Sequence, residues 1–142
     1  MKQKRSNSSP IPTEHYEQAL LFKWANFMDG NDKIPRILVG GKEMSVLDFM
    51  HAVPNGGKRS IKTASDLKAE GVKPGVPDIS LPYPTSKHYG LYIEMKRQKG
   101  GVVSEHQRKW LTYLNEAGYL AVVCKGFEQA KEAVMKYLTE EI

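Results

Sequence analysis

The sequence has one cysteine, four scattered histidines and no long apolar run. Cys124 has no partner for a disulfide within the chain, and its apolar neighbours predict a buried thiol. The histidines and the single cysteine lack the paired spacing of a zinc site. No stretch approaches the roughly 20 apolar residues of a membrane-spanning helix, and the polar residues 1–9 lack the apolar segment of a secretory signal. We therefore expect a soluble protein of a reducing compartment with no membrane partner.

The charge balance is basic. The 142 residues include 21 Lys and Arg against 16 Asp and Glu, a net charge of +5, which favours a polyanionic partner. Many basic proteins bind nothing anionic, so charge alone leaves the partner open. Residues 1–12 predict a flexible basic arm, either a disordered terminus or an arm that grasps DNA. The length fits one domain, which we place at residues 13–142.

Hydrophobic periodicity and turn residues predict an order of helices and strands. The predicted helices span about 14–28, 63–70, 104–117 and 127–139, and the predicted strands span 37–39, 47–53, 78–83, 89–96 and 119–124. Residues 33–50 otherwise show no regular period. Strands 78–83 and 89–96 are expected to pair as an antiparallel hairpin. This order predicts an α/β fold with a central mixed sheet flanked by helices.

Two acidic residues and a lysine fall on the predicted hairpin, in Pro77-Asp78 and Glu94-Met95-Lys96. Antiparallel pairing brings Asp78 and Glu94 to the same end of the hairpin. Carboxylates, with a backbone carbonyl such as that of Met95, are the oxygen ligands that Mg²⁺ prefers. Lys96 can orient a water or stabilise charge on a phosphate. Each pair alone is also an ordinary turn or exposed strand, but together they predict Mg²⁺- or Mn²⁺-dependent phosphodiester hydrolysis.

Further motifs accompany this constellation in a fixed order. They are Pro54-Asn55-Gly56-Gly57, Glu70-Gly71-Val72, Gly75-Val76-Pro77-Asp78, Ile93-Glu94-Met95-Lys96, Gln107 and Gly118-Tyr119. With them the sequence resembles the VRR-NUC branch of the PD-(D/E)xK nucleases over about residues 14–140. The namesake Val-Arg-Arg element is absent, and Val122-Val123-Cys124 stands near its expected place. The resemblance implies a restriction-endonuclease-like fold.

The resemblance also implies two further site residues. Members of this family place a glutamate of the first helix at the metal. We choose Glu17 over Glu14, because Glu17 lies on the apolar face of its helix, where an unpaired charge is costly. Alternatively, Glu17 reaches water or pairs with a lysine. Gln107 resembles the glutamine that positions the catalytic lysine, although Ser104 with Gln107 also forms a capping box.

Several residues are predicted to contact DNA. The loop Asn55, Gly56, Gly57, Lys58 and Arg59 offers backbone amides and two cations to phosphates, or is a turn with solvated charges. Lys73, Arg97 and Lys99 flank the acidic pair in sequence and could extend the same basic rim.

The resemblance implies a structure-specific DNA endonuclease that cuts branched DNA such as Holliday junctions. A junction has two equivalent strands, so one active site per chain predicts a symmetric homodimer. We expect it in the cytoplasm of a bacterium or a phage-infected cell. Two alternatives stay open: a repair or restriction nuclease that acts on flaps or linear duplexes, and an inactive nuclease fold that only binds DNA.

Overall fold

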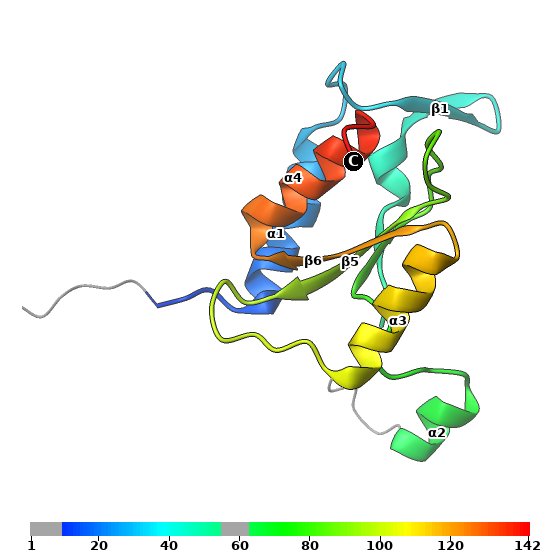
Figure 1. The fold of residues 1–142 in the computed structure, drawn as a ribbon. Helices are drawn as coiled ribbons and strands as arrows, with labels where there is room; N and C mark the ends of the chain where they lie inside the picture. The colour runs from blue at the N-terminus through cyan, green and yellow to red at the C-terminus, as the bar shows by residue number, and fades with distance from the viewer. Residues whose placement is uncertain (1–9, 55–62) are drawn as a thin grey trace, which may run out of the picture.

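The fold was analysed in a computed structural model that describes residues 10–54 and 63–142 (Figure 1). The helices are α1 Glu14–Phe27, α2 Ala64–Ala69, α3 Glu105–Glu116 and α4 Phe127–Leu138, with a 3₁₀ helix η1 at Val46–Phe49. The strands are β1 Arg36–Val39, β2 Lys42–Ser45, β3 His51–Ala52, β4 Ile79–Leu81, β5 Leu91–Lys96 and β6 Leu120–Lys125. In these described parts of the chain, no helix combines the length and apolar composition needed to cross a bilayer.

The central sheet has the strand order β3-β4-β5-β6. Strand β4 pairs antiparallel with β5, whereas β6 runs parallel to β5. Parallel strands need a crossover connection between them, and helix α3 forms the crossover from β5 to β6. The sheet is therefore mixed, and the predicted antiparallel hairpin is confirmed.

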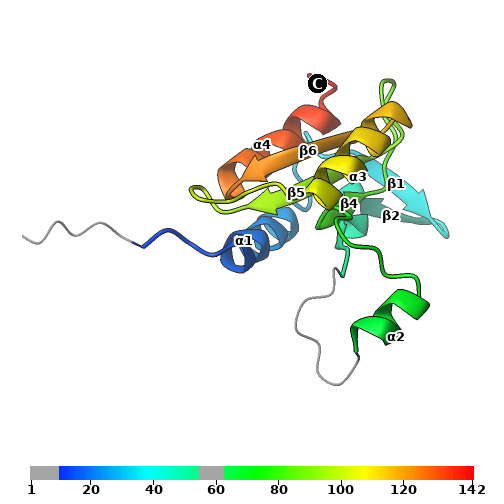
Figure 2. The same cartoon turned by 60° about the horizontal axis from the view of Figure 1, so that its bottom comes forward.

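Helices cover both faces of this sheet (Figures 1 and 2). Helices α1 and α4 lie together on one face, and α3 lies on the other. Side chains alternate along β5, so the buried Leu91, Ile93 and Met95 point toward α1 and α4. Glu94 and Lys96 point toward α3, where they meet Gln107. Strand β5 thus has an apolar face that builds the core and a polar face that builds the site.

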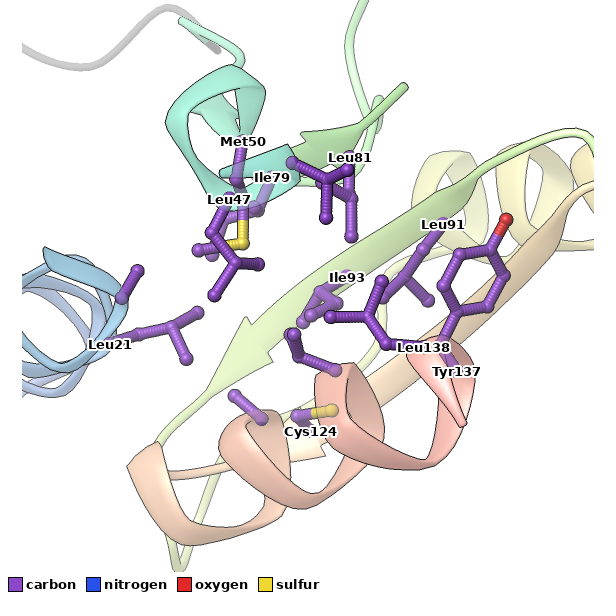
Figure 3. Close-up of a cluster of buried hydrophobic side chains, with 14 of the residues drawn as sticks. Leu21, Leu47, Met50, Ile79, Leu81, Leu91, Ile93, Cys124, Tyr137 and Leu138 are labelled. Atoms are coloured by element: carbon purple, nitrogen blue, oxygen red, sulfur yellow. The ribbon is translucent and has the colours of Figure 1, made fainter. Parts of the chain in front are cut away.

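The core fills the space between the sheet and the α1–α4 layer (Figure 3). Leu21 from α1, Ile93 from β5 and Tyr137 from α4 are all fully buried there. The Tyr137 hydroxyl donates to the carbonyl of Tyr83 at 2.6 Å, so its polar atom is satisfied inside the fold. Cys124 lies in the same cluster, as predicted, and burial raises the pKa of its thiol to about 12. Packing in the core holds β5 in place, and this also holds Glu94 and Lys96 on its opposite face.

The segment predicted as a strand at 47–53 is mostly not a strand. Ser45 caps η1 by accepting from the Leu47 amide at 3.2 Å, and only β3 pairs with the sheet. The apolar residues Val46, Leu47 and Met50 are buried with helical rather than alternating spacing. The predicted strand at 47–53 is therefore wrong, except for the two residues of β3.

A separate hairpin occupies the stretch whose sequence showed no regular period. Strand β1, predicted at 37–39, pairs with β2 through Gly40 and Gly41, which both have positive φ. Two adjacent positive-φ residues form the tight turn that suits a two-residue hairpin. Helices α1, α2, α3 and α4 lie within a residue or two of their predicted ranges.

Candidate active site

Asp78 directly precedes β4, and the register of the hairpin fixes its position. Ile79 is the partner of Ile93, so Asp78 stands across from Glu94 at the same end of the sheet. The Asp78 Oδ2 atom accepts a hydrogen bond from the Met95 backbone N–H at 2.8 Å. This bond continues the antiparallel ladder through a side chain. It fixes the Asp78 carboxyl beside β5.

The buried Glu94 and Lys96 form one hydrogen-bonded group with the half-buried Gln107. Gln107 Nε2 donates to Glu94 Oε1 at 2.8 Å, and Lys96 Nζ donates to Gln107 Oε1 at 2.9 Å. Lys96 Nζ is also 3.6 Å from Glu94 Oε1. Glu94 and Lys96 are only 2% and 7% exposed. The lysine is therefore held by two neighbours in a region with little water, where its charge acts strongly on any phosphate that enters.

Gln107 fills both of the roles considered from its sequence. Its side chain accepts from the Ser104 amide at 2.9 Å, while its own amide donates to the Ser104 hydroxyl at 3.2 Å. The capping box therefore fixes the side chain at the start of α3, where it bridges Lys96 and Glu94. Gln107 can therefore cap α3 and contact Lys96 and Glu94 at the same time.

The acidic pair is electrostatically strained. Burial, followed by the negative charge of Asp78, raises the pKa of Glu94 to about 8, against a smaller opposing effect of Lys96. Burial also raises the pKa of Asp78, although the Met95 N–H partly offsets it. A buried and a half-buried carboxyl this close do not both ionise readily without a compensating cation. The pair therefore holds a proton or attracts a positive ion at neutral pH.

The residues present fit a divalent metal ion. Glu94 Oε2 is buried and accepts no hydrogen bond from the residues that the structure describes. An orphaned carboxylate oxygen beside a second carboxyl is a hard-oxygen donor set of the kind Mg²⁺ and Mn²⁺ accept. Within residues 10–54 and 63–142, no group of three or more His, Cys, Asp or Glu side chains converges on one point. Backbone carbonyl and water ligands must therefore complete the coordination.

Glu17, predicted as a metal ligand, makes its described contacts with residues other than this pair. It is buried, as the apolar face predicted, at 4% exposure. Its Oε1 accepts from Gln98 Nε2 at 2.8 Å, and its Oε2 lies against Gly126, where a Cβ would collide with it. A side-chain donor that sequence reasoning missed thus satisfies half of this carboxylate. Glu17 joins α1 to the ends of β5 and β6.

Glu14 is the α1 carboxylate that faces the site. Its negative charge is among the groups that raise the pKa of Asp78. Both residues line one cavity of about 410 Å³, together with His15, Gln18, Ala19, Phe22 and Ala52. The sequence carried a signal for this, because Glu14 and Gln18 are four residues apart and share one helix face. Burial on the apolar stripe favours Glu17, whereas Glu14 lies at an exposed edge of the helix.

The predicted DNA contacts are only partly described. Asn55, Gly56, Gly57, Lys58 and Arg59 lie outside the described residues. Lys73, Arg97 and Lys99 are exposed. Arg97 donates from its guanidinium to the Ile11 carbonyl at 3.1 Å, which ties the residues before α1 to the end of β5.

The fold and the site together define a class. A mixed sheet whose antiparallel hairpin brings Asp78, Glu94 and Lys96 to one end is the core of restriction-endonuclease-like, PD-(D/E)xK nucleases.

Comparisons with known proteins identify the family within this class. The family model for the VRR-NUC domain matches residues 13–128. A solved structure described as a VRR_NUC domain protein is similar to this chain with a TM-score of 0.70 and 25% sequence identity, covering 92% of this chain and 91% of the other. A search of curated proteins found no match. The chain belongs to the VRR-NUC family of nucleases.

Proposed function

We propose that the protein is a Mg²⁺- or Mn²⁺-dependent endonuclease that hydrolyses phosphodiester bonds in branched DNA. The observation that carries the proposal is the pair of half-buried Asp78 and buried Glu94, with its orphaned Glu94 oxygen, beside a lysine fixed by Gln107. Membership of a nuclease family supports the phosphodiesterase chemistry. The basic net charge supports a nucleic-acid partner.

The acidic side chains would hold the metal. Asp78 and Glu94 would supply carboxylate oxygens, the Met95 carbonyl would supply a further oxygen, and Glu14 would act from α1 through a water ligand. When bound, such an ion polarises a phosphate oxygen and lowers the pKa of water. The proton on the acidic pair must leave for both carboxylates to act as ligands.

Lys96 would be the catalytic cation, and its effect would depend on where its Nζ atom is held. Its Nζ would orient the attacking water or stabilise the charge that develops on the phosphate. Gln107 holds the ammonium through a hydrogen bond, while Lys96 Nζ stays 3.6 Å from Glu94 Oε1. A hydrogen bond from Met95 holds Asp78 without occupying all of its lone pairs.

Branched DNA is the proposed substrate, as the resemblance to compact, junction-resolving members of this family implies. Symmetric cleavage of a four-way junction then requires two copies of the chain, and we propose a homodimer. A flap or a linear duplex is the alternative substrate.

The test is a cleavage assay with purified protein on a four-way junction, a flap and a linear duplex, each titrated with Mg²⁺ or Mn²⁺. Asp78→Asn and Lys96→Ala should each lower cleavage by at least about 100-fold, as loss of a catalytic group does. Glu132→Ala is the matched control, since this exposed α4 carboxylate only pairs with Lys136. Cleavage by Asp78→Asn at the wild-type rate would exclude the proposed mechanism. Size-exclusion chromatography with light scattering tests the dimer.

A further inference from the structure

A second concave surface lies beside the site, between residues 73–74 and α3. Its cavity of about 450 Å³ is lined by Lys73, Pro74, His106, Lys109, Trp110 and Tyr113. This volume falls in the range of roughly 300–1,000 Å³ that small-molecule ligands occupy. We call these six residues the Trp110 groove.

The Trp110 groove adjoins the proposed catalytic residues through the backbone. Gly75 packs so closely on the His106–Gln107 peptide that a Cβ at residue 75 would overlap it. Gln107 in turn contacts Lys96 and Glu94. His106 in the groove is therefore the neighbour of Gln107, the residue that holds the proposed catalytic lysine.

The lining combines aromatic faces with cations. Trp110 is half-buried, and Tyr113, which is 59% exposed, meets it edge to face with ring centroids 6.2 Å apart. Lys73 and Lys109 are exposed on opposite walls, from the segment before β4 and from α3. No carboxylate lines the groove in the described part of the chain. An aromatic platform between two ammonium groups matches a nucleobase joined to its phosphates.

We propose that the Trp110 groove binds an unpaired nucleobase of the DNA substrate, with the base stacked on Trp110 and the adjacent phosphates held by Lys73 and Lys109. Inside a duplex, both faces of a base are covered by its neighbours. Only an unpaired or unstacked nucleotide, at a flap, junction or single-stranded end, exposes a face to the indole. The inference rests on the proposed nuclease function and specifies its substrate: DNA with an unpaired nucleotide near the bond that is cut.

Binding is measured without divalent metal, in EDTA, so that it does not depend on cleavage. The chain has two tryptophans, and Trp24→Phe leaves Trp110 as the only indole. A single-stranded oligothymidylate should quench its fluorescence on binding. A blunt hairpin whose two strands are joined by a non-nucleotide linker, so that every base is paired, should not. A fluorescent label on each DNA reports binding independently.

The second measurement compares variants on a flap and on the blunt hairpin. Trp110→Ala should bind the flap about 10-fold more weakly, as loss of one base–aromatic stack predicts, and should bind the hairpin almost unchanged. Phe27→Ala is the matched control, because Phe27 is 84% exposed at the far end of α1. The double variant Lys73→Ala/Lys109→Ala should bind the flap with a shallower slope of log affinity against log salt concentration. The reduction should correspond to the loss of about two phosphate contacts.

Bound oligothymidylate that leaves Trp110 unquenched would overturn the proposal, as would an equal loss of flap and hairpin binding in Trp110→Ala. The fluorescence result stands even if Trp110→Ala fails to fold, because Trp24→Phe retains the groove. Selective flap binding without any metal-dependent cleavage would reject the proposed function and leave the Trp110 groove supported.

Discussion

The raised pKa of Glu94 predicts that the metal-free protein loses stability as the pH rises. In the unfolded chain this carboxyl has its ordinary pKa near 4.5, whereas in the fold its pKa is about 8. Between these values the folded protein keeps a proton that the unfolded chain has released. The stability contribution is therefore highest below about pH 4.5 and falls as the pH rises toward 8.

The magnitude follows from the same linkage. One proton held only by the folded state makes the free energy of unfolding fall by at most about 1.4 kcal/mol for each pH unit. Across pH 5 to 8 the loss is then of order 3 kcal/mol. Asp78 shifts in the same direction, so it adds to the trend. Acidic groups whose pKa is lowered, such as the exposed Glu132, act in the opposite direction at lower pH.

The assay is urea unfolding in EDTA at several pH values, with Glu94→Gln as the reference. The glutamine cannot ionise and its Oε1 can still accept from Gln107, so the difference between the two proteins isolates the carboxyl. The wild type should lose stability relative to Glu94→Gln from pH 5 to 8. Added Mg²⁺ should stabilise the wild type increasingly over the same range, because binding displaces the proton.

A difference between the two proteins that stays constant from pH 5 to 8 would refute the reasoning. It would mean that Glu94 is already ionised in the fold. Stabilisation by Mg²⁺ that is independent of pH would refute the link between the proton and the metal.

Three other predictions test how the fold holds the site. Glu14→Gln should lower metal-dependent cleavage by at least about 10-fold, while Glu17→Gln should change it by less than about threefold, as initial rates would show. Gly126→Ala should destabilise the protein by about 2–3 kcal/mol in urea unfolding, since residue 126 has φ +90 and a Cβ there meets Glu17; an unchanged midpoint would contradict this. Tyr137→Phe should cost about 1–2 kcal/mol, because the Tyr83 carbonyl loses its buried donor; a stability equal to the wild type would show that water replaces the hydroxyl.

The sequence was sufficient where the signal was local or where period and register forced the outcome. Strand periodicity put Glu94 and Lys96 on one face of β5, and the hairpin register put Asp78 opposite Glu94. The capping box placed Gln107 at the start of α3. These features depend on neighbours close in sequence, so they can be read from the residues alone.

Tertiary structure decided which face of α1 meets the site. Glu14 and Glu17 differ by less than one helical turn, and the choice depends on how α1 lies against the sheet. The partner of Glu17, Gln98, is far away in sequence and no local pattern announces it. The bend from β2 into η1 likewise depends on burial of Val46 and Leu47 in a core formed by distant segments. The sequence determined the chemistry of the acidic pair and its lysine, and the packing of α1 and α3 on the sheet determined which other side chains reach them.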